Sequence, residues 1–260
     1  SLLIPAEHGS WPWLLVPFFV GVAVAGRWSW AVLPALIGGL SAFLLRQPAT
    51  AWLRIRQGRG RRSDESLAAA WTLLLLFVAL TCLLLLLYMG LTSLLWLLPP
   101  LAIILGAYLA VAQINRANVR SLWMELAGAA GLAAMAPTGY LAAGAPLNGT
   151  AWALWVILGL QNLLGALYVR LRIADTRKRE MSRRLVLFAH LLGLVAIMIL
   201  GRALGLSPLL AILFLAFLLR AIWSASTPRP IADIRKFGFS EVAVETLSGL
   251  WIIASFLLQL

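Results

Sequence analysis

Residues 67–89 read LAAAWTLLLLFVALTCLLLLLYM, a run of 23 residues without a charged side chain. A helix needs about 20 apolar residues to cross the hydrocarbon core of a bilayer. Backbone polar groups inside lipid must also be satisfied within the segment, which a helix achieves. The run therefore predicts a transmembrane helix.

The composition extends this prediction to the whole chain. Of the 260 residues, 62% are hydrophobic and only 12% are charged. Soluble domains are about half apolar and about a quarter charged. Too little polar surface is left to cover a water-soluble body, so we expect residues 1–260 to form a single integral membrane domain.

Eight further apolar runs have a length that could cross a membrane, although Trp11–Gly26 and Ser207–Ala221 are short. No ten-residue alternating pattern of a membrane β-barrel occurs. We therefore predict an all-α, polytopic transmembrane helix bundle of about nine helices. The expected spans are Trp11–Gly26, Trp28–Leu45, Leu67–Met89, Leu91–Ala112, Leu122–Leu141, Ala151–Tyr168, Leu185–Gly205, Ser207–Ala221 and Phe239–Leu258.

The basic residues set the expected orientation. With nine crossings and a cytoplasmic N-terminus, 19 of the 21 Lys and Arg residues fall in inner loops, and only Arg27 and Arg202 fall outside. Short cytoplasmic loops carry such an excess of Lys and Arg. We predict a cytoplasmic N-terminus and an outer C-terminus. The net charge of +12 is then a topology signal, and no nucleic-acid partner is predicted.

Polar groups within the predicted helices lie near the inner end. Glu241 and Glu245 are four residues apart and share one helix face, and Glu125, Asn162 and His190 fall at a similar level. Ionisable groups at membrane depth usually face a bundle interior or a wet cavity. These five residues are candidates to line a cavity open to the cytoplasm.

These polar residues could instead have purely structural roles. A carboxylate in a first helical turn, as predicted for Glu125 and Glu241, is stabilised by the helix dipole. Gln161 and Asn162 could equally hydrogen-bond between helices, and His190 could be a hydrogen-bonded packing residue. The sequence leaves these alternatives open.

Arginine outnumbers lysine by 19 to 2. A guanidinium group binds phosphate through two parallel hydrogen bonds, which an ammonium group cannot do. We therefore take Arg46, Arg54, Arg170 and Arg172, in or beside the two largest inner loops, as candidate substrate-binding residues. The alternative is a general attraction to anionic lipids.

The segment before the first helix contains Glu7-His8-Gly9. An acid beside an imidazole suits acid–base chemistry or contact with a polar headgroup, so Glu7, His8 and the deeper Glu245 are the candidate catalytic residues. Cys82 is the only cysteine. No metal site and no disulfide within the chain are predicted.

Several blocks resemble the YwiC-like family of bacterial membrane proteins. They are Pro5-Ala6-Glu7-His8-Gly9-Ser10-Trp11, Leu14-Leu15-Val16-Pro17-Phe18, Leu44-Leu45-Arg46-Gln47-Pro48, Tyr168-Val169-Arg170-Leu171-Arg172 and Phe237-Gly238-Phe239-Ser240-Glu241. The resemblance implies a multi-pass protein of the bacterial cytoplasmic (inner) membrane.

The expected architecture is also similar to that of the UbiA-type intramembrane prenyltransferases. That likeness implies two functional inner loops, after the second and sixth helices, in which aspartate motifs hold Mg²⁺ and a prenyl diphosphate. Here the two loops carry mainly arginines, with Asp64, Asp175 and Glu180 as their isolated or terminal acids. No definite cofactor is predicted, and Mg²⁺ stays open.

These observations together predict a cytoplasm-facing, arginine-rich cavity that binds an anionic or isoprenoid membrane lipid. If the chain is an enzyme, transfer on a prenyl or lipid phosphate is the expected class of reaction. Two alternatives remain: a non-catalytic subunit that docks onto a membrane protein complex, and a membrane transporter.

Overall fold

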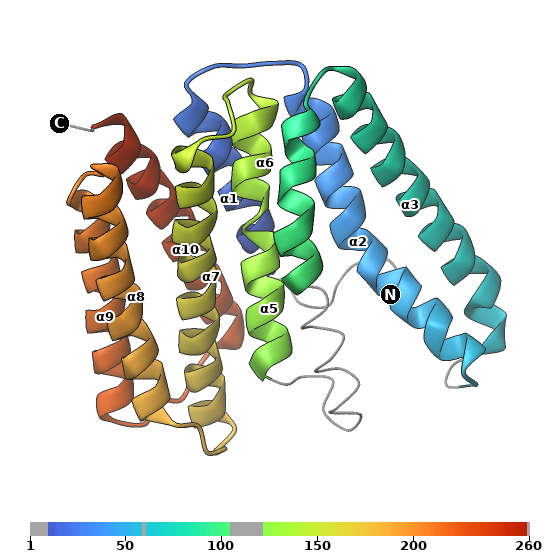
Figure 1. Ribbon diagram of the computed structural model, residues 1–260. Coiled ribbons are helices and arrows are strands. Elements are labelled where there is room, and N and C mark those ends of the chain that lie inside the picture. Colours follow the sequence, from blue (N-terminus) through green and yellow to red (C-terminus); the bar gives the residue numbers. More distant parts are fainter. Residues whose placement is uncertain (1–9, 59–60, 105–121, 259–260) are drawn as a thin grey trace.

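The computed structural model describes residues 10–58, 61–104 and 122–258, and regular structure in these ranges is helical throughout (Figure 1). Six of the helices are long and apolar enough to cross a membrane, so the chain is a multi-pass membrane protein. The α-helices with both bounds in the described ranges are α1 Ser10–Ala25, α2 Val32–Arg56, α3 Glu65–Tyr88, α5 Leu122–Leu132, α6 Met135–Ala142, α7 Gly149–Thr176, α8 Arg183–Leu204, α9 Leu209–Ser226 and α10 Ile234–Leu257, with 3₁₀ segments η1 Arg62–Asp64 and η2 Thr92–Leu97. Residues 98–104 are α-helical as well.

Helical structure lies at each of the nine predicted spans. The fifth span is divided between α5 and α6, which are separated by a turn at Ala133 and Ala134. The fourth is described as an apolar helix from Thr92 to Ile104, and its predicted remainder lies outside the described residues. The first span is short, as expected, with 16 residues in α1. The eighth was wrongly expected to be short, because α9 continues to Ser226.

Two helices extend well beyond the predicted spans. Helix α2 does not end at Leu45 but continues through Pro48 to Arg56. Helix α10 begins at Ile234 and not at Phe239, because the Asp233 side chain accepts hydrogen bonds from the first backbone N–H groups of the helix. The earlier start places Glu245 at the middle of α10, since it is the twelfth of 24 residues.

Apart from α5 and α6, which run in the same direction as parts of one span, successive helices run in alternate directions. The α2–α3, α7–α8 and α9–α10 connections lie at one end of the bundle, and the α1–α2, α6–α7 and α8–α9 connections lie at the other (Figure 1). The first end carries most of the described basic residues and is called the arginine-rich end below. Among its residues are Arg54, Arg56, Arg61, Arg62, Arg177, Lys178, Arg179, Arg183, Arg184, Arg229, Arg235 and Lys236.

The centre of the bundle is a close crossing of α1 and α6. A Cβ atom on Gly21 would lie 2.0 Å from the carbonyl oxygen of Ala136, and one on Gly139 would lie 2.4 Å from that of Phe18. Only glycine permits the two backbones to approach this closely. Phe18 and Leu141 are fully buried on either side of the crossing.

Polar side chains fix the start of two helices that position the site described below. Asn148 Oδ1 accepts from Ala151 N at the start of α7, and Ser182 Oγ accepts from Leu185 N at the start of α8. Asn148 opens an Asn-x-Thr triplet, so a helix cap accounts for this asparagine without any modification. At its other end α8 stops at Gly205, whose φ of 63° is left-handed.

Tryptophans near the ends of membrane helices commonly bridge lipid tails and headgroups. Trp28, Trp30, Trp96 and Trp123 are exposed, as such a position requires. Trp155 is different: it is only 8% exposed, and its indole N–H donates to the carbonyl of Ala130. This indole joins α7 to α5 inside the bundle.

Candidate functional site

At the arginine-rich end, a carboxylate ties together three parts of the chain. Asp175, in the last turn of α7, accepts from Arg183 Nη2 of α8 at 2.5 Å through Oδ1, and from the backbone N–H of Arg229 at 2.8 Å through Oδ2. Thr176 Oγ1 accepts from Ile231 N beside it. The α7–α8 turn and the α9–α10 connection are thereby held as one unit.

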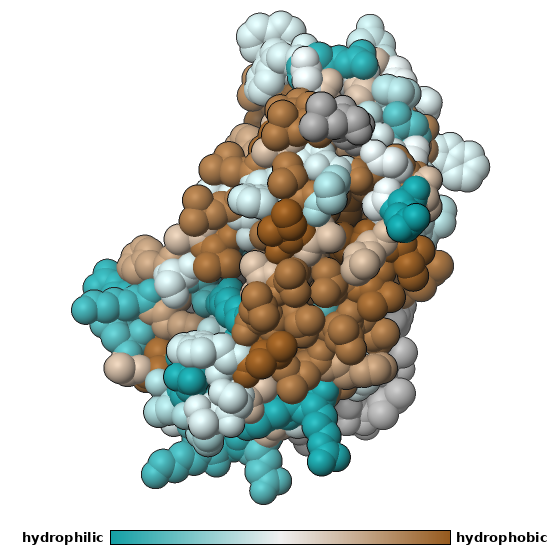
Figure 2. All heavy atoms as spheres, turned by 90° about the vertical axis from the view of Figure 1, so that its left-hand side faces the viewer, coloured by the Kyte–Doolittle hydropathy of each residue, from teal (hydrophilic) through white to brown (hydrophobic). Residues whose placement is uncertain are grey.

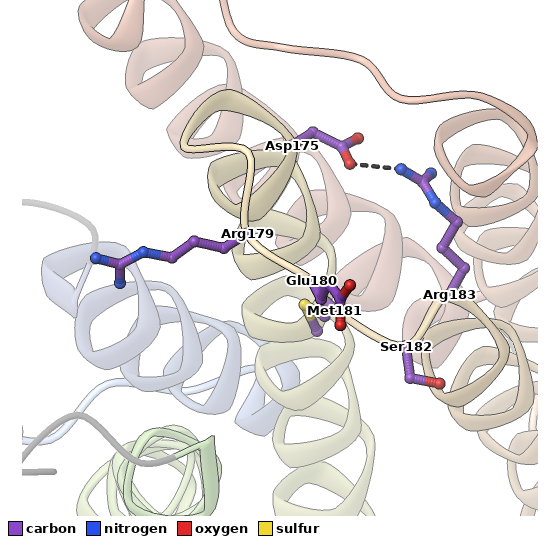
Figure 3. Close-up of a pocket in the computed structure, with 6 residues that line it drawn as sticks. All are labelled: Asp175, Arg179, Glu180, Met181, Ser182 and Arg183. Carbon is purple, nitrogen blue, oxygen red and sulfur yellow. Dashed lines mark hydrogen bonds and ion pairs between the residues drawn. The ribbon is translucent and has the colours of Figure 1, made fainter.

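A pocket of about 530 Å³ opens at this turn and is lined by Asp175, Arg179, Glu180, Met181, Ser182 and Arg183. Figure 3 shows Arg183 reaching toward Asp175, whereas Arg179 extends away on the other side of the turn. Seven basic and two acidic residues occur between Arg170 and Arg184. The surroundings of the pocket therefore carry a clear excess of positive charge.

Arg172, a predicted substrate-binding residue, lies in an aromatic setting. Its guanidinium group donates to the Tyr168 hydroxyl at 2.8 Å and to the Arg229 carbonyl at 3.0 Å. It also lies 5.5 Å and 5.3 Å from the ring centres of Trp223 and Phe237. These contacts join α7 to α9 and α10 and give Arg172 a packing role, while its role in substrate binding stays a prediction.

Further into the bundle, α9 and α10 share an ion pair. Arg220 donates to Glu241, and its guanidinium group also lies 3.6 Å from the centre of the Tyr168 ring. Both charged side chains are less than one quarter exposed. Arg220 is placed to interact electrostatically with His190 and Glu245 as well, so this arginine is the central cation of a group formed by α7, α8, α9 and α10.

The deepest members of this group are Gln161 and Glu245. Both are buried, with 2% and 7% exposure, and the Gln161 amide is within reach of the Glu245 carboxyl group. Neither amide atom of Gln161 forms a hydrogen bond of ordinary geometry, and neither does Oε1 of Glu245. His190 is also buried but partnered, since its Nδ1 contacts the Val186 carbonyl at 2.8 Å.

A second set of predicted residues lies between α5 and α7. Arg170 donates to Glu125 at 2.7 Å, and both side chains are about one third exposed. Asn162 Nδ2 donates to the carbonyls of Trp13 and Ala129, each at 3.1 Å. Asn162 thus joins α7 to α1 and α5, which is the interhelical role that the sequence left open for it.

Two of the remaining predicted residues, Arg46 and Arg54, lie in the described ranges. Arg46 and Arg54 are on α2, and the α2–α3 turn is on the opposite side of the bundle from α8 and α9 (Figure 1). Glu7 and His8 lie outside the described residues. Among the described residues, no three His, Cys, Asp or Glu side chains are grouped as a metal site requires.

Sequence reasoning missed several of the contacts that build the arginine-rich end. Ser182 before the apolar run of α8 is a recognisable cap signal. Tyr168 and Arg172 are four residues apart on one helix face, which could have indicated their contact. The pairing of Asp175 with Arg183 and Arg229 had no such signal, because α7 must first be placed against α8 and the α9–α10 connection.

Comparison with known proteins supports the predicted family resemblance over the first half of the chain. A family model described as YwiC-like protein matches residues 4–140, just over half of the chain. The match ends within α6, so the two later blocks assigned to this family, Tyr168–Arg172 and Phe237–Glu241, are not part of it. Searches of the curated proteins and of the solved structures gave no match, and the likeness to UbiA-type prenyltransferases gains no support. From the extent of the match, which includes the Glu-His-Gly-x-Trp opening, the chain belongs to the YwiC-like family.

Proposed function

We propose that this membrane protein binds the anionic headgroup of a membrane lipid at its arginine-rich end. The observation that carries the proposal is the pocket at the α7–α8 turn, lined by Arg179 and Arg183. A lipid phosphate there would lie beside Arg183, and the exposed Arg179 side chain could turn toward it to donate paired hydrogen bonds. It would also lie near the N-terminus of α8, whose dipole favours an anion.

One of the two arginines that line the pocket is already fixed in place. Arg183 is held by Asp175 and by the Ser224 carbonyl at 2.9 Å, so little side-chain entropy is left to lose on binding. Arg179 and Arg184 are exposed beside it and free to close on a ligand. The lining also includes Asp175 and Glu180, but Asp175 is already neutralised by Arg183. The positive charge therefore comes from the exposed arginines.

The outer face of α8 suits the acyl chains of the same lipid. Directly after Arg184, this helix exposes a row of apolar side chains: Leu185, Phe188, Leu191, Leu192, Val195, Met198 and Ile199. Figure 2 shows a broad hydrophobic band on this side of the bundle with hydrophilic atoms at its lower end. The 22 residues of α8 span roughly 33 Å, close to the hydrocarbon thickness of about 30 Å.

The distribution of charge supports a cytoplasmic location for this end. Lys and Arg are retained on the cytoplasmic side of bacterial membranes, and anionic lipids attract such surfaces. We accordingly place the protein in the bacterial cytoplasmic membrane with the α7–α8 pocket facing the inner leaflet.

Lipid titration followed by native mass spectrometry tests the proposal. Arg179→Ala/Arg184→Ala is expected to weaken binding of phosphatidylglycerol by roughly tenfold or more, because a tenfold loss corresponds to only about 1.4 kcal/mol. Arg27→Ala/Arg202→Ala is the matched control, since it removes two arginines at the opposite end. Binding of phosphatidylcholine serves as the neutral reference. Equal loss in both double variants, or no preference for the anionic lipid, would contradict a headgroup site at the α7–α8 turn.

A further inference from the structure

The hydrogen-bonding needs of Gln161 and Glu245 are unmet in the described chain. Three of their polar atoms lack a partner: Nε2 and Oε1 of Gln161, and Oε1 of Glu245. The two residues are near the midpoints of α7 and α10. A buried polar atom without a partner costs about 1–3 kcal/mol, so an arrangement that satisfies all three at once is strongly favoured.

The charge state of Glu245 decides whether the pair can satisfy itself. An ionised carboxylate only accepts hydrogen bonds, so it could accept from Nε2 but would leave the amide oxygen of Gln161 unpaired. A protonated carboxyl group is both donor and acceptor. It can donate to Gln161 Oε1 while it accepts from Gln161 Nε2, which closes a ring of two hydrogen bonds.

We propose that Glu245 and Gln161 form an intramembrane proton-binding site, with the proton held on the Glu245 carboxyl group and hydrogen-bonded to the Gln161 amide oxygen. On loading, one O–H bond forms at Glu245 with a proton taken from water. On release, the proton returns to water and the carboxylate remains. The ligand is a single proton, so the site requires no cavity of its own.

Charged and titratable side chains lie between Glu245 and the arginine-rich end. Glu241 is one turn nearer to that end on the same helix and is paired with Arg220 of α9. Arg220 also influences His190 of α8. Helix α1, which packs against α10, has no titratable side chain along Ser10–Ala25. The charged groups described beside Glu245 thus lie on its arginine-rich side, at the Arg220–Glu241 pair.

Infrared difference spectroscopy of the protein in lipid nanodiscs tests the site. Spectra are compared between neutral and alkaline pH, above about pH 5, where exposed carboxyl groups are already ionised. The wild-type protein is expected to show the carbonyl band of a protonated carboxyl group that disappears as the pH rises. Glu245→Gln is expected to lack this band, whereas Glu180→Gln, at the exposed α7–α8 turn, is expected to keep it.

A second variant separates the role of the amide from that of the carboxyl group. Gln161→Leu is expected to keep the band but to shift it, because the carbonyl of Glu245 loses the hydrogen bond from Nε2. Glu245→Gln is expected to fold, since glutamine has the shape and neutrality of the protonated acid. A band that persists in Glu245→Gln, the absence of any band in the wild-type protein, or an unshifted band in Gln161→Leu would overturn the proposal.

Discussion

Arg220→Ala is expected to lower the free energy of unfolding by about 3 kcal/mol, one of the two largest effects expected in this chain. The substitution leaves the Glu241 carboxylate without its cation inside the bundle, and breaking a buried pair on one side costs about 3–5 kcal/mol. It also removes the contact of the guanidinium group with the Tyr168 ring, which lies 3.6 Å away. Thermal unfolding of the purified protein in detergent measures the effect.

Arg184→Ala is the control for this substitution, because Arg184 is exposed at the start of α8. It should change the unfolding temperature little. In Arg220→Ala/Glu241→Ala no uncompensated carboxylate remains at position 241, so the double variant should be less destabilised than the sum of its single variants. Equal unfolding temperatures for Arg220→Ala and Arg184→Ala would show that the ion pair does not stabilise the fold.

Gly21→Ala and Gly165→Ala are expected to change stability in opposite directions. The new Cβ at position 21 would meet the Ala136 carbonyl oxygen at 2.0 Å, and backbone atoms cannot rotate away as a side chain can. Helices α1 and α6 must then separate, at a cost of roughly 1–3 kcal/mol or more. Gly165 has no heavy atom within 4 Å of the corresponding Cβ position, so alanine there should stabilise α7 by up to about 1 kcal/mol.

The unfolding temperatures of the two glycine variants, recorded in the same detergent, measure the difference. Gly165→Ala controls for the helix propensity of alanine, which both variants gain. A Gly21→Ala protein that is as stable as Gly165→Ala would show that the α1–α6 crossing is looser than the backbone positions indicate.

The helix positions could be read from the sequence because the lipid imposes one simple rule on every span. An apolar run such as residues 67–89 has few alternatives to a membrane helix. The rule fails at the ends of helices, where water replaces lipid. Helix α2 therefore continues past Arg46 and Pro48, and α10 starts before Phe239.

The candidate site was harder to predict, because its contacts join distant parts of the chain. The sequence identified Glu241 and Glu245 as costly groups at membrane depth, and the structure supplies Arg220 as the partner of Glu241. Gln161 is 84 residues from Glu245, and nothing in the spacing of the two residues predicts that α7 and α10 bring them together. Asn162, adjacent to Gln161, points instead to α1 and α5.

A cytoplasmic arginine-rich end is tested most directly by labelling single cysteines in intact cells with a membrane-impermeant maleimide. Cys82→Ala removes the only native cysteine. Thr227→Cys then places an exposed thiol in the α9–α10 connection without removing a basic residue, and Pro146→Cys places one in the α6–α7 connection at the opposite end. We expect Pro146→Cys to be labelled in intact cells, and Thr227→Cys to be labelled only after the membrane is permeabilised. Labelling of Thr227→Cys in intact cells, with protection of Pro146→Cys, would contradict both the orientation and the inner-leaflet lipid site.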